Sequence, residues 1–128
     1  MSILAPISAG ELVDKITILR VKAVRIGDPA KEANVRKELA LLEGIAAEKL
    51  VPSAELDRLT AELTEINAAL WDIEEGKRAC ERTQDFGPEF IQLARRVYLD
   101  NDKRAAVKRQ INSLSGSEIF EEKSYKQY

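Results

Sequence analysis

Apolar residues recur every three or four positions in four segments of the chain, which is the spacing of one face of an α-helix. The first segment, residues 8–26, starts with Ser8 and Glu11 at capping-box spacing. The second segment, residues 29–49, starts with an aspartate and a proline, which suit a helix cap and a first helical position. We therefore expect both segments to be helices.

The third segment, residues 53–84, has the most regular pattern. Six apolar residues alternate steps of three and four like the a and d positions of a coiled coil: Leu56, Leu59, Leu63, Ile66, Leu70 and Ile73. A helix of roughly 32 residues spans about 48 Å, which is longer than the first two. The fourth helix or a second copy of the chain must cover this overhang, and from the mismatch we predict a homodimer.

The fourth segment, residues 88–113, follows a corner that contains Gly87 and Pro88. The residues 100–102 permit either a break or a continuous helix, and we favour a continuous helix because basic residues and alanines resume at once. The tail, residues 114–128, has no clear period. Its Ile119 and Phe120 can anchor it, so we predict that it packs back on the helices, near the first one.

Short corners between long helices place consecutive helices antiparallel. The sequence thus predicts an all-α fold: an antiparallel up-down bundle of about four helices, in a single domain over residues 1–128. The composition agrees, because 5% aromatic residues, six glycines and four prolines are too few for a β-sandwich or barrel.

Several kinds of chemistry are disfavoured by residues that the chain lacks. It has no histidine, which is the commonest general base and a common metal ligand. Its one cysteine, Cys80, cannot form an intrachain disulfide or a zinc site, and it fits a reducing compartment. No apolar run approaches the roughly 20 residues of a membrane span. We expect a cytoplasmic protein without a membrane segment, cofactor or metal, and these absences weigh against an enzyme.

Charge is distributed unevenly along the chain. Residues 1–76 contain 9 basic and 14 acidic residues, whereas residues 77–112 contain 9 basic and 5 acidic residues. The fourth segment has a basic run: Arg95, Arg96, Lys103, Arg104, Lys108 and Arg109. Nucleic acid is disfavoured as a partner because no aromatic residues or glycine-rich loops accompany this run. Two interpretations remain: a face paired with acidic residues of another helix or chain, or a site for an anionic small molecule.

A second, polar stripe follows the third segment at helical spacing: Thr60, Thr64, Asn67, Trp71, Glu74 and Arg78. It is either another packing face or the wall of a binding site, because tryptophan and arginine are enriched at binding hot spots. In the fourth segment, Asn101 stands at a position of the apolar face where an apolar residue is expected. Either Asn67 and Asn101 pair with each other and fix the helix register, or they contact a ligand.

Two enzyme classes fit parts of the pattern. Acidic pairs one turn apart would hold magnesium for nucleotide pyrophosphate hydrolysis if they faced inward: Glu11 and Asp14, Glu62 and Glu65, Asp72 and Glu75. The usual order of such pairs is missing. A chorismate-mutase bundle has basic residues inside its helical core, and the first helix also contains basic residues. Their spacing does not match that of chorismate mutase.

Four strings of the sequence, taken together, suggest a family: residues 10–19, residues 70–74, residues 94–98 with 101–105, and residues 116–117 with 121–125. They resemble a family of small uncharacterised bacterial proteins, a domain of unknown function. The resemblance implies a setting beside glycosyltransferases and surface-saccharide genes, and no reaction or catalytic residue. It singles out polar residues inside the strings: Glu11, Asp14, Lys15, Trp71, Glu74, Arg95, Tyr98, Asn101, Asp102, Lys123 and Tyr125.

With Asn67 and Arg78 added from the polar stripe, these residues are our candidate binding residues. The sequence predicts a non-catalytic helical binding or assembly module that self-associates and is accessory to saccharide biosynthesis. The expected partner is a second copy of the chain, and a different protein and an anionic small molecule are further candidates. The alternative is a bundle enzyme that binds a small molecule or phosphate, similar to a magnesium-dependent nucleotide pyrophosphatase or to chorismate mutase.

Overall fold

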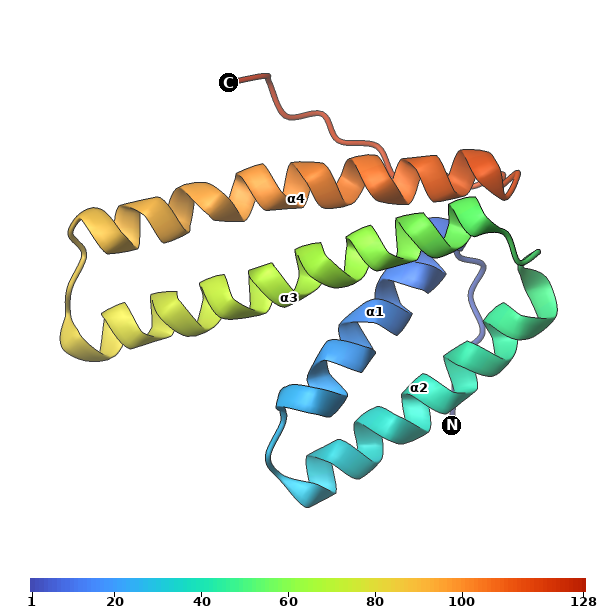
Figure 1. The fold of residues 1–128 in the computed structure, drawn as a ribbon, viewed down its shortest axis with the longest axis horizontal. Helices are drawn as coiled ribbons and strands as arrows, with labels where there is room; N and C mark the ends of the chain where they lie inside the picture. Colours follow the sequence, from blue (N-terminus) through green and yellow to red (C-terminus); the bar gives the residue numbers. More distant parts are fainter.

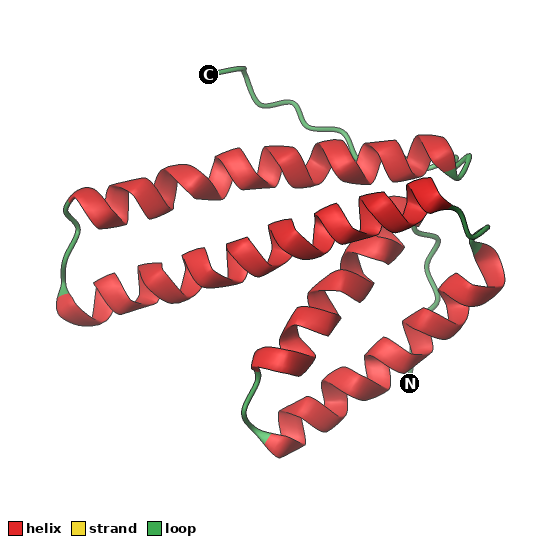
Figure 2. Ribbon diagram, in the orientation of Figure 1, coloured by secondary structure: helices red, strands yellow, loops and turns green.

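The computed structural model describes all 128 residues and contains four α-helices and no strand (Figures 1 and 2). The helices are α1 (Ala9–Arg25), α2 (Pro29–Lys49), α3 (Ala54–Thr83) and α4 (Pro88–Leu114). The predicted all-α class is confirmed, and every predicted helix boundary lies within one residue of the observed one. Helix α4 continues without a break through residues 100–102, as the sequence favoured.

Side-chain caps fix where the helices begin. Ser8 accepts a hydrogen bond from the Glu11 amide at 3.1 Å, and Ser53 accepts one from Leu56 at 3.0 Å. Asp28 caps α2 in the same way, so that the first amides of three helices have partners. These caps are the features that the sequence pattern identified.

The helices form two antiparallel hairpins that diverge from each other (Figure 1). Helix α1 packs against α2, α3 and α4, whereas α2 contacts α1 alone. The most extensive packing is between α3 and α4. The arrangement is therefore asymmetric, with α1 at the junction of the two hairpins. None of the four helices is both long enough and apolar enough to cross a bilayer.

The apolar core lies where α1, α3 and α4 meet. It is made of Val13 from α1, three leucines of the predicted α3 seam and two residues of α4: Leu56, Leu59, Leu63, Val107 and Ile111. Ile73 and Cys80 continue the seam towards the end of the α3–α4 hairpin, where both are buried. Helix α4 runs alongside this end of α3, so the overhang does not by itself require a second chain.

The tail runs back along α4 after Leu114, as predicted (Figure 1). The prediction that Ile119 and Phe120 anchor it is wrong, because they are 45% and 40% exposed and polar contacts hold the tail instead. Ser117 accepts a hydrogen bond from the amide of Ala9 at 3.0 Å, so the tail touches the start of α1. Farther along, Glu122 pairs with Arg109 at 3.2 Å, and the hydroxyl of Tyr128 donates to Asp102 at 2.9 Å.

Candidate functional site

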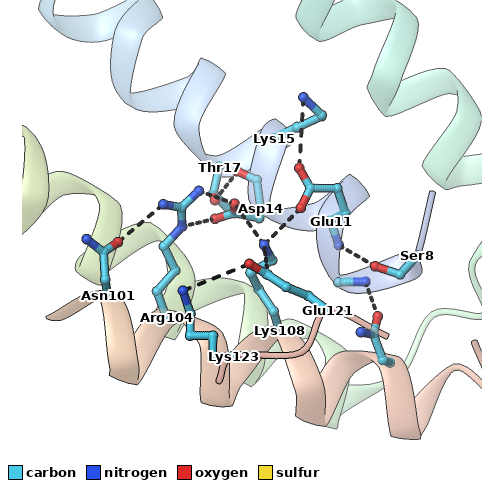
Figure 3. Close-up of polar contacts among 12 residues, drawn as sticks. Ser8, Glu11, Asp14, Lys15, Thr17, Asn101, Arg104, Lys108, Glu121 and Lys123 are labelled. Atoms are coloured by element: carbon cyan, nitrogen blue, oxygen red, sulfur yellow. Dashed lines mark hydrogen bonds and ion pairs between the residues drawn. The ribbon is translucent and has the colours of Figure 1, made fainter. Parts of the chain in front are cut away.

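Asp14 on α1 is fully buried and joins three helices. Its Oδ1 atom accepts hydrogen bonds from Nδ2 of Asn67 on α3 at 3.0 Å and from Nε of Arg104 on α4 at 2.9 Å. Nη2 of Arg104 donates to the other carboxylate oxygen, so the guanidinium and carboxylate form a two-pronged pair (Figure 3). The same hydrogen bond to Asp14 raises the pKa of Arg104, which keeps its charge.

Asn67 is bound by α1 and not by Asn101. Its Nδ2 also donates to Oγ1 of Thr17 at 2.9 Å, and Thr17 in turn donates to the backbone carbonyl of Asp14. Asn101 accepts a long hydrogen bond, 3.4 Å, from Arg104. The predicted pairing of the two asparagines is therefore wrong, because a charged carboxylate is a stronger acceptor for the Asn67 amide.

Lys108 lies one turn beyond Arg104 and has a side chain that is only 9% exposed. Its Nζ atom lies 2.8 Å from Oε2 of Glu11, 2.7 Å from Oε2 of Glu121 and 3.8 Å from Oδ2 of Asp14 (Figure 3). Burial alone would lower the pKa of Lys108, but the hydrogen bonds with Glu11 and Glu121 raise it overall. The buried group is therefore an ammonium ion.

No buried side-chain nitrogen or oxygen in this cluster lacks a hydrogen-bond partner. Within one chain, the carboxylates of Glu11, Asp14 and Glu121 face three cations: Arg104, Lys108 and Lys123. This supports the interpretation that the basic run of α4 pairs with acidic residues elsewhere. Buried ion pairs of this kind fix the relative positions of helices more than they add stability.

A separate groove of about 380 Å³ lies between α1 and α3. Ile18 and Val21 from α1 and Leu70 from α3 form its apolar part, and Trp71 and Arg78 line it on the α3 side. Its other lining residues are polar: Asn67, Glu74, Glu75 and Arg104. Four of the six residues of the polar stripe line this groove, whereas Thr60 and Thr64 do not and donate to backbone carbonyls of α3. Asn67, the buried one of the four, connects the groove to Asp14.

The predicted acidic pairs do not converge. No group of three carboxylates or cysteines lies close enough together to hold a metal ion. Glu62 pairs with Arg58, and Asp72 pairs with Arg25, at the surface. The inward-facing set of acids that a magnesium pyrophosphatase requires is therefore not formed.

The structure brings most of the candidate residues into three places. Glu11, Asp14, Asn67, Asn101 and Lys123 surround Arg104 and Lys108. Trp71, Glu74 and Arg78 line the groove.

Tyr98 and Asp102 form the third place, against Tyr128 of the tail. Two candidates contribute little: Arg95 is exposed and makes only a 3.5 Å contact with Gln92, and Lys15 is an exposed partner of Glu11 at 3.9 Å. Tyr125 is exposed, with Lys123 over its ring.

Three residues of the cluster were absent from the candidate set: Arg104, Lys108 and Glu121. A signal for the first two was available, because residues 104, 108 and 111 are spaced to share one face of α4 and Ile111 is in the core. On α1, Glu11 and Asp14 also lie about one turn apart, so two acidic residues on α1 could face the two basic residues on α4. Glu121 gave no such signal, because its position depends on how the tail folds back.

Comparison with known proteins adds one result. No curated protein and no solved structure matches the chain. The model of DUF6165, described as a family of unknown function, matches residues 3–128, and it therefore covers all four helices and the tail. The chain belongs to this family of unknown function, DUF6165.

Proposed function

We propose that the protein is a non-catalytic binding module that holds a partner protein in the groove between α1 and α3. One observation supports this most: Trp71 and Arg78 both line this groove of about 380 Å³, together with three apolar residues. Tryptophan and arginine are the residue types that most often dominate binding energy at protein interfaces. The groove lies outside the apolar core, so a partner reaches it without unfolding the chain.

The arrangement of reactive groups favours binding over catalysis. In the groove, Glu74 pairs with Lys77 at 3.2 Å, and Arg104 is bound to Asp14. The one thiol, Cys80, is buried, and burial raises its pKa, so that it is not a thiolate nucleophile at neutral pH. No side chain in the groove is arranged as a nucleophile beside a base.

The lining also indicates what the partner presents. Ile18, Val21 and Leu70 favour an apolar side chain, and Trp71 offers a flat surface beside them. Arg78 is in none of the ion pairs of the structure, so it is available to a carboxylate of the partner. A protein segment with an apolar residue next to an acidic one has this chemistry. The resemblance described above suggests that the partner takes part in saccharide assembly.

The test compares three purified variants as bait in extracts of cells that produce the protein. We expect Trp71→Ala and Arg78→Ala to lose a partner that the natural chain retains. Arg82→Ala is the matched control, because Arg82 is an exposed arginine one turn farther along α3 that does not line the groove. Circular dichroism confirms that helix content is unchanged. Equal capture by all variants would contradict the proposal.

A second measurement separates this proposal from the enzyme alternative. Thermal melts are recorded with nucleotides, sugar nucleotides and magnesium, because a ligand that binds only the folded state raises the melting temperature. A rise above about 3 °C that Trp71→Ala abolishes would assign the groove to a small molecule instead of a protein.

We also propose that the chain forms a homodimer through α2. None of the residues of α2 is buried, and Leu41 and Ile45, which are 63% and 39% exposed, line an open apolar groove beside the N-terminal residues. An uncovered row of apolar residues on a helix favours contact with another apolar surface. Sedimentation velocity should give twice the chain mass, and Leu41→Glu should return the mass of one chain, whereas Glu38→Gln should not. A monomer at all concentrations would contradict self-association.

A further inference from the structure

A small polar cavity lies between the first turns of α1, the second half of α4 and the tail (Figure 3). Its volume is about 260 Å³, and all but one of its lining residues are polar: Glu11, Asn101, Arg104, Lys108, Glu121 and Lys123. It shares only Arg104 with the Trp71 groove, so the two sites are distinct. Such a lining suits a small charged ligand.

The buried ammonium of Lys108 is the strongest feature of this cavity. Two of its carboxylate neighbours, Glu11 and Asp14, lie on α1, the helix that packs against all three others. The third, Glu121, belongs to the tail and makes the closest approach, 2.7 Å. The tail thus places a carboxylate directly on a cation that the helices have buried.

Apart from Glu121, the charges around the cavity are net positive. Three cations face the two carboxylates of α1: Arg104, Lys108 and Lys123. Without Glu121 the net charge is about +1, and Glu121 brings it to about zero. A phosphate group is negatively charged at neutral pH, so it can take the place of the glutamate.

The tail holds Glu121 in place only at the surface. Residues 118–128 are all exposed, and the side chain of Glu121 itself remains 47% exposed. The neighbouring ion pair of Glu122 with Arg109 is also exposed, and exposed pairs contribute little to stability. The hydrogen bond from Lys108 lowers the pKa of Glu121, so its carboxylate stays charged at neutral pH. An anion from solution therefore competes with the weakly held carboxylate of Glu121 for Lys108.

We propose that this cavity is a phosphate-binding site and that Glu121 is a tethered carboxylate that stays on Lys108 until a phosphate group displaces the glutamate side chain, while the rest of the tail stays in place. Lys108 and Lys123 bind the phosphate oxygens, and the Asn101 amide, whose oxygen faces Arg104, supplies a further donor. With Glu121 in its wall, the cavity of about 260 Å³ is smaller than the roughly 300–1,000 Å³ of drug-sized ligand sites, so it suits a group of phosphate size.

The test is a titration of the full chain with inorganic phosphate at constant ionic strength, followed by calorimetry. Glu121→Gln removes the internal carboxylate charge, and we expect it to bind phosphate at least about tenfold more tightly than the natural chain. Glu122→Gln is the matched control, because it removes an equal charge from the next residue of the tail, outside the cavity. It should bind like the natural chain.

A second pair of variants tests the cations. Lys108→Met in the Glu121→Gln background should abolish binding, and the exposed Lys123→Gln, which leaves the buried cluster intact, should weaken it several-fold. A parallel titration with glycerol 3-phosphate shows whether a phosphate monoester or free phosphate is preferred. Equal affinity of Glu121→Gln and Glu122→Gln, or no phosphate binding by any variant, would overturn the proposal.

Discussion

Helices α1 and α2 belong to one hairpin, yet they relate to the rest of the molecule in opposite ways. Helix α1 has 17 residues and buries nine of them, including the fully buried Asp14 and Thr17. Helix α2 has 21 residues and buries none. The difference follows from contacts, because α1 packs against three helices and α2 packs against one.

This comparison shows that apolar content does not decide which helix is central. Helix α2 has an apolar row at helical spacing, Val35, Leu39, Leu42 and Ala46, and each of these side chains is only half-buried against α1. Helix α1 instead buries a charged residue, because Arg104 and Lys108 of α4 lie opposite it. Stability should therefore be concentrated in α1, and α2 should tolerate change.

The largest expected effect comes from removing the buried charge of α1. Asp14→Ala leaves the guanidinium of Arg104 without a carboxylate partner at the helix junction, whereas Lys108 keeps Glu11 and Glu121. Breaking a buried ion pair from one side typically costs about 3–5 kcal/mol, and urea unfolding should show this loss. Glu43→Ala on α2 removes an exposed partner of Arg20 and should cost less than about 1 kcal/mol. Equal costs would refute the asymmetry.

Glycine-to-alanine substitutions in the two helices should change stability in opposite directions. A Cβ atom at Gly10 of α1 would overlap the carbonyl oxygen of Lys108 and lie 2.8 Å from Oδ1 of Asn112. The two helices would have to separate, which costs about 1–3 kcal/mol. A Cβ atom at Gly44 of α2 meets nothing within 4 Å, so alanine should stabilise the helix by about 0.5–1 kcal/mol.

Both glycine variants are measured by the shift of the urea midpoint at an unchanged slope. The result of interest is the sign. If Gly10→Ala were neutral, the close approach of α1 and α4 would be less tight than the structure shows, and the central position of α1 would have to be reconsidered.

The helices could be predicted well from the sequence because they depend on local features. Ser8, Asp28 and Ser53 act on amides two or three residues away, and the seam from Leu56 to Ile73 depends on period alone. The peripheral position of α2 could not be predicted, because an apolar stripe does not specify which helices lie opposite it.

The candidate site was predicted in part, and the misses share a physical cause. Asp14 and Asn67 were singled out, but Arg104, the partner of Asp14, was not. Basic residues recur at helical spacing whether they face the core or the solvent, so spacing alone does not tell the two apart. Arg104 was therefore grouped with exposed residues such as Arg95. Glu121 lies in a segment without period, and its contact with Lys108 exists only once the tail has folded back.

Removal of the tail should affect α1 and leave α2 unchanged. Deleting residues 117–128 removes the hydrogen bond between Ser117 and Ala9 and the ion pair between Glu121 and Lys108. Both contacts are partly buried, and we expect their removal to cost about 1–2 kcal/mol, or roughly 3–6 °C in melting temperature. Hydrogen exchange should become faster in the first turn of α1 and stay the same in α2. An unchanged melt would contradict a docked tail.

The smallest expected effect is a pH dependence of tail docking. The hydrogen bond from Lys108 lowers the pKa of Glu121 below its ordinary value of 4.5, with further attraction from Lys123 and Arg104. Because the folded pKa is the lower one, this contribution is fully present above pH 4.5 and is lost as the pH falls through the folded pKa. Neutral Glu121 no longer competes with Glu11 and Asp14 for the ammonium, so the NMR chemical shifts of residues 117–128 should move towards those of an undocked tail in acid. In Glu121→Gln, these shifts should not change over that range, and a pH dependence as steep as that of the natural chain would assign the effect to another group.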